Sequence, residues 1–183
     1  MGGGVRDLLL DKKPKDFDIA TDATPEQIHG LFRNSRIIGR RFRLVHIRYG
    51  REVIEVATFR SHTEDSPKNE LSNEGRILRD NTFGDIEDDA LRRDFTVNAM
   101  YYDIDGFSVL DYANGLADIE ARTLRLIGDP TTRYQEDPVR MLRAVRFAAK
   151  LDFEIEASTA EAIFECGPLL SGIPAARLFD ETV

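Results

Sequence analysis

The sequence has few of the residues on which several common protein classes depend. Its 183 residues include one cysteine, so no internal disulfide can form, and this predicts a reducing compartment such as the cytoplasm. No apolar run is long enough to cross a bilayer and no secretory signal is visible, so we expect no membrane partner. The three histidines at positions 29, 46 and 62 show neither ligand spacing nor triad order. We therefore treat all three as non-catalytic.

Charge is distributed unevenly along the chain. The formal net charge of −8 would by itself argue against a nucleic-acid partner. Residues 33–51, however, contain seven arginines and no carboxylate, and we call them the basic segment. A local basic surface steers polyanions even on an acidic protein. The chain length allows one good hydrophobic core, or one domain with a small appendage.

Asp16 and Asp18 are separated by one residue at the start of a predicted strand, residues 17–20. Side chains alternate along a strand, so the two carboxylates point to the same face. Like charges this close repel each other, and a divalent cation is the simplest way to offset the repulsion. A pair of this kind on its own is usually solvated, so it predicts a metal site only together with its neighbours.

One such neighbour is the glycine run at residues 2–4, which precedes a predicted short helix at residues 5–10. A glycine run leaves backbone N–H groups open to an anion, and the positive end of a helix favours one. Alone, the run would be read as a turn. Beside two metal-binding carboxylates, it predicts chemistry on a nucleoside triphosphate.

Glu55 is a candidate third carboxylate. It lies in an otherwise apolar predicted strand, residues 53–59, which pairs with residues 43–49 through a turn at Gly50 and Arg51. On a buried side of the sheet Glu55 would need a partner, and the alternative is that it faces solvent. Beside Asp16 and Asp18 it would complete the carboxylates of a two-metal phosphoryl transfer.

Two further segments carry arginines that could bind phosphates. The first is a helix predicted over residues 85–100, which holds Arg93, Asp94 and Asn98. The second is a helix predicted over residues 138–151, with Asp137 as its N-cap and arginines at positions 140, 143 and 146. Guanidinium groups suit phosphates and bases because their fork of donors is planar. Ordinary ion pairs or a solvated helix face would show the same spacing.

The remaining pattern predicts α+β structure up to about residue 125 and helices after it. Thr24, Pro25 and Gln27 form a capping box that starts a helix. The pattern predicts a mobile loop over residues 61–79 and a hairpin over 101–110. It also predicts a short strand over 124–127 and a helix over 158–167 that starts with a capping box at Ser158.

Four motifs together resemble, in order and spacing, the class II nucleotidyltransferases of the polymerase-β-like superfamily, which include bacterial poly(A) polymerases and tRNA CCA-adding enzymes. They are GGGVRD with DFD (residues 2–7 and 16–18), IEVATFR (54–60), RRDFTVN (92–98) and EDPVRMLR (136–143). Residues 36–44 look like the poly(A) polymerase type. The resemblance implies an α+β fold: a nucleotidyltransferase head with a mixed or antiparallel sheet and flanking helices (1–125), then an all-helical neck that binds RNA and nucleotide (126–183).

The resemblance also implies a role for each motif residue. Asp16 and Asp18 would hold Mg²⁺ or Mn²⁺, with Glu55 and Asp94 as further catalytic carboxylates. Asp137 would help to select the base. The full set of residues expected to bind the incoming nucleotide is Gly3, Arg6, Arg93, Asp137, Arg140 and Arg143.

The implied reaction is attack of an RNA 3′-hydroxyl on the α-phosphate of ATP, with release of pyrophosphate and growth of a template-independent A tail. One alternative is CCA addition, which would need CTP as well as ATP. Another is an inactive RNA- or nucleotide-binding remnant.

Both ends of the chain depart from the family pattern. The strand expected before the glycines and the helices expected after Val183 are missing, so we expect a piece truncated at both ends. A missing strand would expose a sheet edge through which this piece could associate, whereas we expect the full-length protein to be a monomer.

Overall fold

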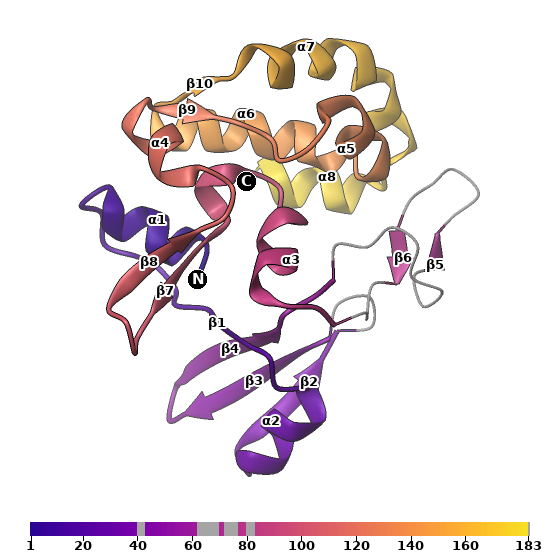
Figure 1. Cartoon of the computed structure of the whole chain (residues 1–183). Helices are drawn as coiled ribbons and strands as arrows, with labels where there is room; N and C mark the ends of the chain where they lie inside the picture. Colours follow the sequence, from indigo (N-terminus) through magenta and orange to yellow (C-terminus); the bar gives the residue numbers. More distant parts are fainter. Residues whose placement is uncertain (40–42, 62–69, 72–76, 80–82, 183) are drawn as a thin grey trace.

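A computed structural model describes residues 1–39, 43–61, 70–71, 77–79 and 83–182 (Figure 1). The chain forms a four-stranded sheet at one end, a group of helices at the other, and a hairpin with several short helices between them. Among the described residues, no helix is long and apolar enough to cross a membrane.

The four-stranded sheet has the order β1-β4-β3-β2. Its strands are β1 (Ile19–Thr21), β2 (Ser35–Ile38), β3 (Leu44–Tyr49) and β4 (Glu52–Thr58). β1 is parallel to β4, and the other pairs are antiparallel, so the sheet is mixed as predicted. Helix α2 (Pro25–Leu31) packs on one face, where its Ile28 joins Val45, Ile47 and Val56 in a buried cluster.

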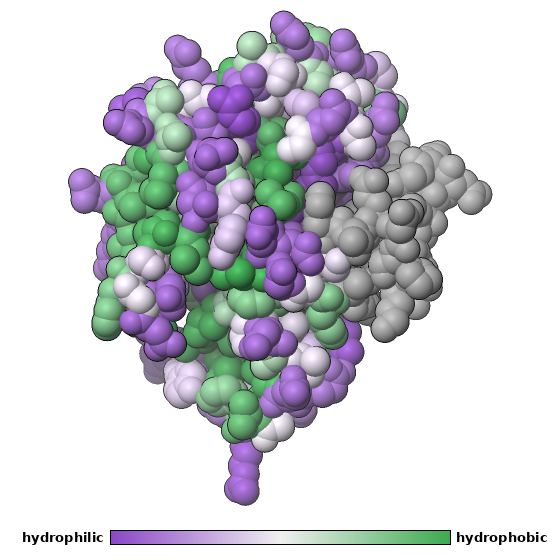
Figure 2. Space-filling view, in the orientation of Figure 1, coloured by the Kyte–Doolittle hydropathy of each residue, from purple (hydrophilic) through white to green (hydrophobic). Residues whose placement is uncertain are grey.

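The middle of the molecule joins the sheet to the helices. The hairpin of β7 (Met100–Asp103) and β8 (Ser108–Asp111) lies beside α1 (Gly3–Leu9), and the helices α3 (Ile86–Leu91), η1 (Thr96–Asn98) and α4 (Gly115–Glu120) pack around them. Figure 2 shows apolar residues gathered over α1 and this hairpin, where Leu8, Ile104 and Phe107 are exposed.

The helical end is built from α5 (Pro130–Glu136), α6 (Val139–Leu151), α7 (Ala157–Cys166), η2 (Gly167–Gly172) and α8 (Ala175–Thr182). A two-residue strand, β10 (Glu154–Ile155), interrupts the helices and pairs with β9 (Thr123–Leu124). The largest buried cluster runs from Phe95 through Tyr134 and Phe147 to Cys166. This core therefore joins residues on both sides of position 125.

Several local predictions are confirmed. Thr24 caps α2: its hydroxyl oxygen accepts a hydrogen bond from the Gln27 N–H, and the Gln27 side-chain oxygen accepts one from the Thr24 N–H. The β3–β4 hairpin turns at Gly50, whose φ of 61° glycine adopts more readily than other residues. The β7–β8 hairpin covers the predicted 101–110 region and extends one residue beyond it at each end.

Other predictions need correction. The first strand begins at Ile19, so Asp16 and Asp18 lie in the extended segment before it. The helix predicted over 85–100 ends at Leu91, because the backbone at residues 94–96 pairs with residues 125–127 instead. Helix α6 begins at Val139, one residue later than predicted. The cap of α7 is Glu156 and not Ser158.

The predicted mobile loop, residues 61–79, lies largely outside the described residues. Its described part includes two short antiparallel strands, β5 (Glu70–Leu71) and β6 (Ile77–Arg79). Strand β2, within the basic segment, was not predicted.

Candidate active site

Asp16, Asp18 and Glu55 gather at the β1 side of the sheet. Ile19 pairs with Val56 in parallel register, so the residue before each, Asp18 and Glu55, lie side by side. Burial raises the pKa of the Asp18 carboxyl, and the charges of Glu55 and Asp16 raise it further. The carboxylates of Asp16 and Glu55 therefore both lie close enough to oppose ionisation of Asp18.

Glu55 lies on the exposed face of the sheet, which is the alternative to a buried side that the sequence left open. Its carboxylate is 2.9 Å from Nε2 of His46, the residue directly opposite it on β3. The Glu55 side chain is 50% exposed and that of His46 is 31% exposed. Glu55 is thus half covered and accessible from the sheet surface.

The glycine run lies against this cluster. Gly2 has a φ of 62° and donates its N–H to the Met100 carbonyl, which fixes the turn before α1. A Cβ at Gly4 would come within 3.1 Å of the Asp16 carbonyl oxygen, so the absence of a side chain lets α1 approach the carboxylate segment. At Gly3 a Cβ would make only ordinary contact, with the Arg6 side chain.

Arg93 brings a positive charge to the same place. A Cβ at Gly2 would lie 3.2 Å from Nη1 of Arg93, and the Arg93 charge opposes the rise in the pKa of Asp18. Arg93 therefore sits between the glycine turn and the carboxylates. Burial alone would lower the pKa of Arg93, but Tyr101 and Asp89 raise it, so the guanidinium remains charged.

Asp89 holds Arg93 in this position, and the sequence analysis missed it. Its buried carboxylate accepts from Nη2 of Arg93 at 2.9 Å, from Nε of Arg92 at 3.0 Å and from the Tyr101 hydroxyl at 2.5 Å. Burial would raise the pKa of Asp89, but the two guanidinium groups hold it below its usual value. The i, i+4 spacing of Asp89 and Arg93 was the available signal.

Asp94 belongs to a second, buried group. Burial alone would raise the pKa of Asp94, but Arg143, whose Nη2 lies 2.7 Å from the carboxylate, lowers it. Asp94 also accepts from the Phe95 N–H and the Asn98 amide. Arg6 is 2% exposed; it donates to Asn98 and Asp7 and stacks 5.3 Å from the Phe147 ring centre.

The remaining predicted nucleotide-binding residues lie at the start of α6. Arg140 donates from Nη1 to Glu136 and to the Arg133 carbonyl, both at 2.7 Å. Asp137 accepts from Nη2 of Arg177, on α8, at 2.6 Å. Helix α8 also supplies Glu181, which pairs with Arg143 at 3.1 Å. All these groups therefore have protein partners.

Arg133 connects the head motif to the neck motif and was also missed. Its Nη2 donates to the Arg92 and Arg93 carbonyls at 2.6 and 2.8 Å, and its Nη1 pairs with Glu136. Burial lowers the pKa of Arg133 to about 10. The turn that carries Arg93 and the segment that carries Asp137 are thus tied together by one side chain.

The donor set fits a magnesium ion shared with a substrate. No three His, Cys, Asp or Glu side chains converge as a complete metal site within the described ranges. Mg²⁺ usually takes only one or two protein carboxylates and completes its shell with waters and substrate phosphates. Burial raises the pKa of Asp18 most, and the neighbouring Glu55 and Asp16 carboxylates add to the rise, so a cation at this place would favour the ionised form.

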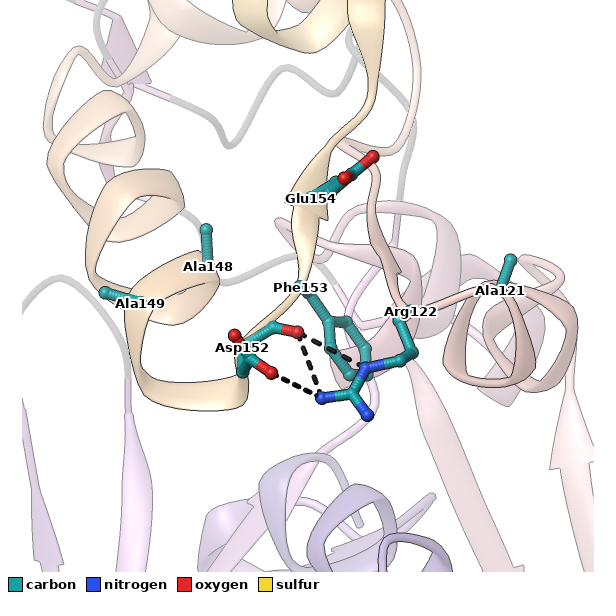
Figure 3. Close-up of a pocket in the computed structure, with 7 residues that line it drawn as sticks. All are labelled: Ala121, Arg122, Ala148, Ala149, Asp152, Phe153 and Glu154. Carbon is teal, nitrogen blue, oxygen red and sulfur yellow. Dashed lines mark hydrogen bonds and ion pairs between the residues drawn. The ribbon is translucent and has the colours of Figure 1, made fainter.

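A separate hollow of about 680 Å³ lies at the far end of α6 (Figure 3). The side chains of Arg122 and Asp152 point toward each other there and form an exposed ion pair at 2.7 Å. The hollow is lined by Ala121, Arg122, Ala148, Ala149, Asp152, Phe153 and Glu154, none of which is a predicted site residue.

Comparison with known families agrees with this arrangement. A family model described as "Poly A polymerase head domain" matches residues 1–125, more than half of the chain. The chain belongs to this family. A second model, described as "Probable RNA and SrmB- binding site of polymerase A", matches residues 152–183. The predicted resemblance to the nucleotidyltransferases is therefore confirmed.

Individual relatives refine the comparison. Poly(A) polymerase I of Salmonella typhi is 58% identical over 187 residues, covering 100% of this chain and 40% of the relative. A CCA-adding enzyme of Bacillus pumilus is 39% identical, over 97% of this chain and 42% of that enzyme. The crystal structure of the Bacillus stearothermophilus CCA-adding enzyme in complex with CTP superposes with a TM-score of 0.84 at 35% identity, covering 99% of this chain and 42% of that one.

This chain thus spans about two fifths of the length of the curated relatives it matches. The predicted mixed α+β head is confirmed, and the higher identity favours the poly(A) polymerase type over the CCA-adding type.

Proposed function

We propose that this chain carries the catalytic head of a template-independent RNA adenylyltransferase, which transfers AMP from ATP to an RNA 3′-hydroxyl. The observation that carries the proposal is the cluster of Asp16, Asp18 and Glu55 beside the glycine turn and Arg93. A carboxylate cluster next to a guanidinium and a glycine turn suits a metal–triphosphate substrate.

In this proposal Asp16 and Asp18 hold Mg²⁺ or Mn²⁺, and Glu55 is a further carboxylate beside them. When bound, the metal stabilises the negative charge that develops at the attacking and leaving oxygens. Arg93, oriented by Asp89 and Tyr101, keeps its Nη1 toward the glycine turn, where it can contact a phosphate. The RNA 3′-hydroxyl releases its proton to solvent and its oxygen bonds to the α-phosphorus, as the bond from that phosphorus to the pyrophosphate oxygen breaks.

The head–neck boundary would bind the rest of the nucleotide. We assign base selection to Asp137 and Arg140, whose side chains are held by Arg177 and Glu136. Arg143 and Asp94 form a charged pair that fixes the turn holding Arg93. Gly3 and Arg6 support the phosphate end, with Arg6 acting through Asn98 because its guanidinium is buried in this structure.

Separate incubations with each nucleoside triphosphate test this proposal. The chain is mixed with Mg²⁺, a short labelled RNA and one triphosphate at a time, and products are resolved by gel. Addition of repeated AMP supports the proposal. Incorporation of CMP would overturn the polyadenylation assignment in favour of CCA addition, the activity named for the Bacillus relatives.

The inactive-remnant alternative has its own outcome. If the incubations give no labelled tail and calorimetry detects no heat when Mg²⁺–ATP is titrated into the protein, the chain has kept the motifs without the activity. We further propose a cytoplasmic protein whose partners are ATP and the RNA 3′ end.

A further inference from the structure

The two faces of the four-stranded sheet differ in what covers them. Val45, Ile47 and Val56 point to the face packed by α2. Arg43 points there too, since its guanidinium pairs with Glu26 of α2 at 2.5 Å. Because side chains alternate along a strand, the residues between these point to the opposite face.

A row of polar side chains crosses that opposite face. Cross-strand register places Glu55 of β4 opposite His46 of β3, and His46 opposite Arg36 of β2. The parallel register of β1 places Asp18 beside Glu55 at the other end of the row. The row therefore begins at the proposed metal site and ends at an arginine of the basic segment.

Arg48 extends the same surface. It lies two residues after His46 on β3, so it shares the face of His46 and pairs across the ladder with Val53. Arg36 and Arg48 are both exposed, and within the described residues neither side chain forms an ion pair or a hydrogen bond. Two unpaired guanidinium groups thus stand on one side of the carboxylate cluster.

We propose that this face of the sheet is the track on which the 3′-terminal nucleotides of single-stranded RNA approach the carboxylates, with Arg36 and Arg48 contacting the phosphodiester backbone. The inference rests on the proposed function and adds a binding surface to it. This surface lies in the head, apart from residues 152–183, which the family comparison associates with RNA.

Charge and dimensions support this occupant. A guanidinium without a protein partner is available for a phosphate, which it binds through two parallel hydrogen bonds. Three strand spacings separate β1 from β2, about 14 Å in total, so the row is long enough for more than one nucleotide. Negative charge at one end and positive charge at the other would orient the RNA with its hydroxyl end at the metal.

A cross-strand ladder that only stabilises the sheet is the competing explanation, and the chain contains a matched control for it. Arg43 belongs to the same basic segment and directly precedes β3, but its side chain points to the α2 face. Arg43→Ala removes the same charge as Arg36→Ala or Arg48→Ala. Only the last two substitutions act on the proposed track.

The test measures binding of a labelled oligoadenylate of about 12 nucleotides by fluorescence anisotropy, without ATP, from about 50 to 200 mM KCl. Each lost phosphate contact lowers the slope of log K against log salt by about 0.7 for single-stranded nucleic acid. We expect this loss for Arg36→Ala and for Arg48→Ala, about twice this loss for the double variant, and an unchanged slope for Arg43→Ala.

An unchanged slope in the double variant, or an equal loss in Arg43→Ala, would overturn the track. Binding of polyglutamate with the same affinity and slope would overturn the assignment to RNA. Thermal melts of all variants check that the fold is intact, since a purely structural ladder would shift the melts and leave the slope unchanged.

The RNA-binding measurement and the AMP-addition measurement can fail separately, so failure of the track is distinguishable from failure of the proposed activity. A salt slope that depends on Arg36 and Arg48 in a protein that adds no AMP would support the track and refute the proposed activity. AMP addition by the wild type, together with an unchanged salt slope in the double variant, would support the proposed activity and refute the track.

Discussion

Asp89 offers the sharpest test of how the site is held together. Its carboxylate, 4% exposed, is the common acceptor for Arg92, Arg93 and the Tyr101 hydroxyl. Asp89→Asn removes the negative charge and leaves two guanidinium groups around a neutral amide. Removing one partner of a buried ion pair typically costs about 3–5 kcal/mol. Because the arginine side chains keep 22% and 20% exposure, we expect the lower end, roughly 3 kcal/mol.

Urea unfolding followed by circular dichroism measures this loss, with Asp152→Asn as the matched control. Asp152 pairs with Arg122 in an exposed pair, side chains 93% and 61% exposed, so its neutralisation should cost about 0–1 kcal/mol. Asparagine tolerates the positive φ of 61° at that position. Equal losses in the two variants would refute the idea that Asp89 is the buried anchor of Arg93.

The same substitution predicts a pH dependence. The folded-state pKa of Asp89 lies below its unfolded value, so its charge stabilises the folded protein above about pH 3.9. That stabilisation is lost as pH falls through the lower folded-state pKa. The difference in unfolding free energy between the wild type and Asp89→Asn should therefore be full at pH 7 and shrink below about pH 4. A difference that grows on acidification would contradict the paired, ionised state of Asp89.

Three further substitutions have defined outcomes. Thr24→Ala removes the α2 capping box and should lower the free energy of unfolding by about 1 kcal/mol in urea melts; no change would mean that the cap is dispensable. Gly115→Ala places a Cβ 2.4 Å from the Thr96 carbonyl oxygen and should cost about 3 kcal/mol, whereas Gly167→Ala, with no atom within 4 Å, should be neutral or stabilising. Asp94→Asn leaves the half-buried Arg143 without its main partner and should abolish AMP addition, and wild-type rates in that variant would remove Asp94 from the site.

Local signals in the sequence predicted the elements that depend on neighbouring residues. The capping box at Thr24 and the turn at Gly50 specify their structures through bonds or dihedral angles within a few residues. The approach of Asp18 to Glu55 was only partly predictable: the polar residue in the apolar strand was visible, but the strand predicted to carry Asp16 and Asp18 begins after them, at Ile19, and it is the β1–β4 register that brings Asp18 beside Glu55.

Elements that depend on distant contacts were not predicted. The helix over 85–100 failed because Phe95 bridges to Leu126 and becomes part of the main core, which overrides the local preference for helix. The role of Arg133 depends on contacts with carbonyl groups some 40 residues away, at Arg92 and Arg93. No pattern near residue 133 encodes such contacts.

We propose that the carboxylates beside the glycine turn carry out nucleotidyl transfer, and a matched pair of variants tests this role. Mg²⁺-dependent addition of AMP to a labelled RNA is measured for Asp18→Asn and for Asp22→Asn, an exposed carboxylate four residues along the chain. We expect Asp18→Asn to lose addition and Asp22→Asn to keep the wild-type rate. Addition by Asp18→Asn at the wild-type rate would contradict the claim.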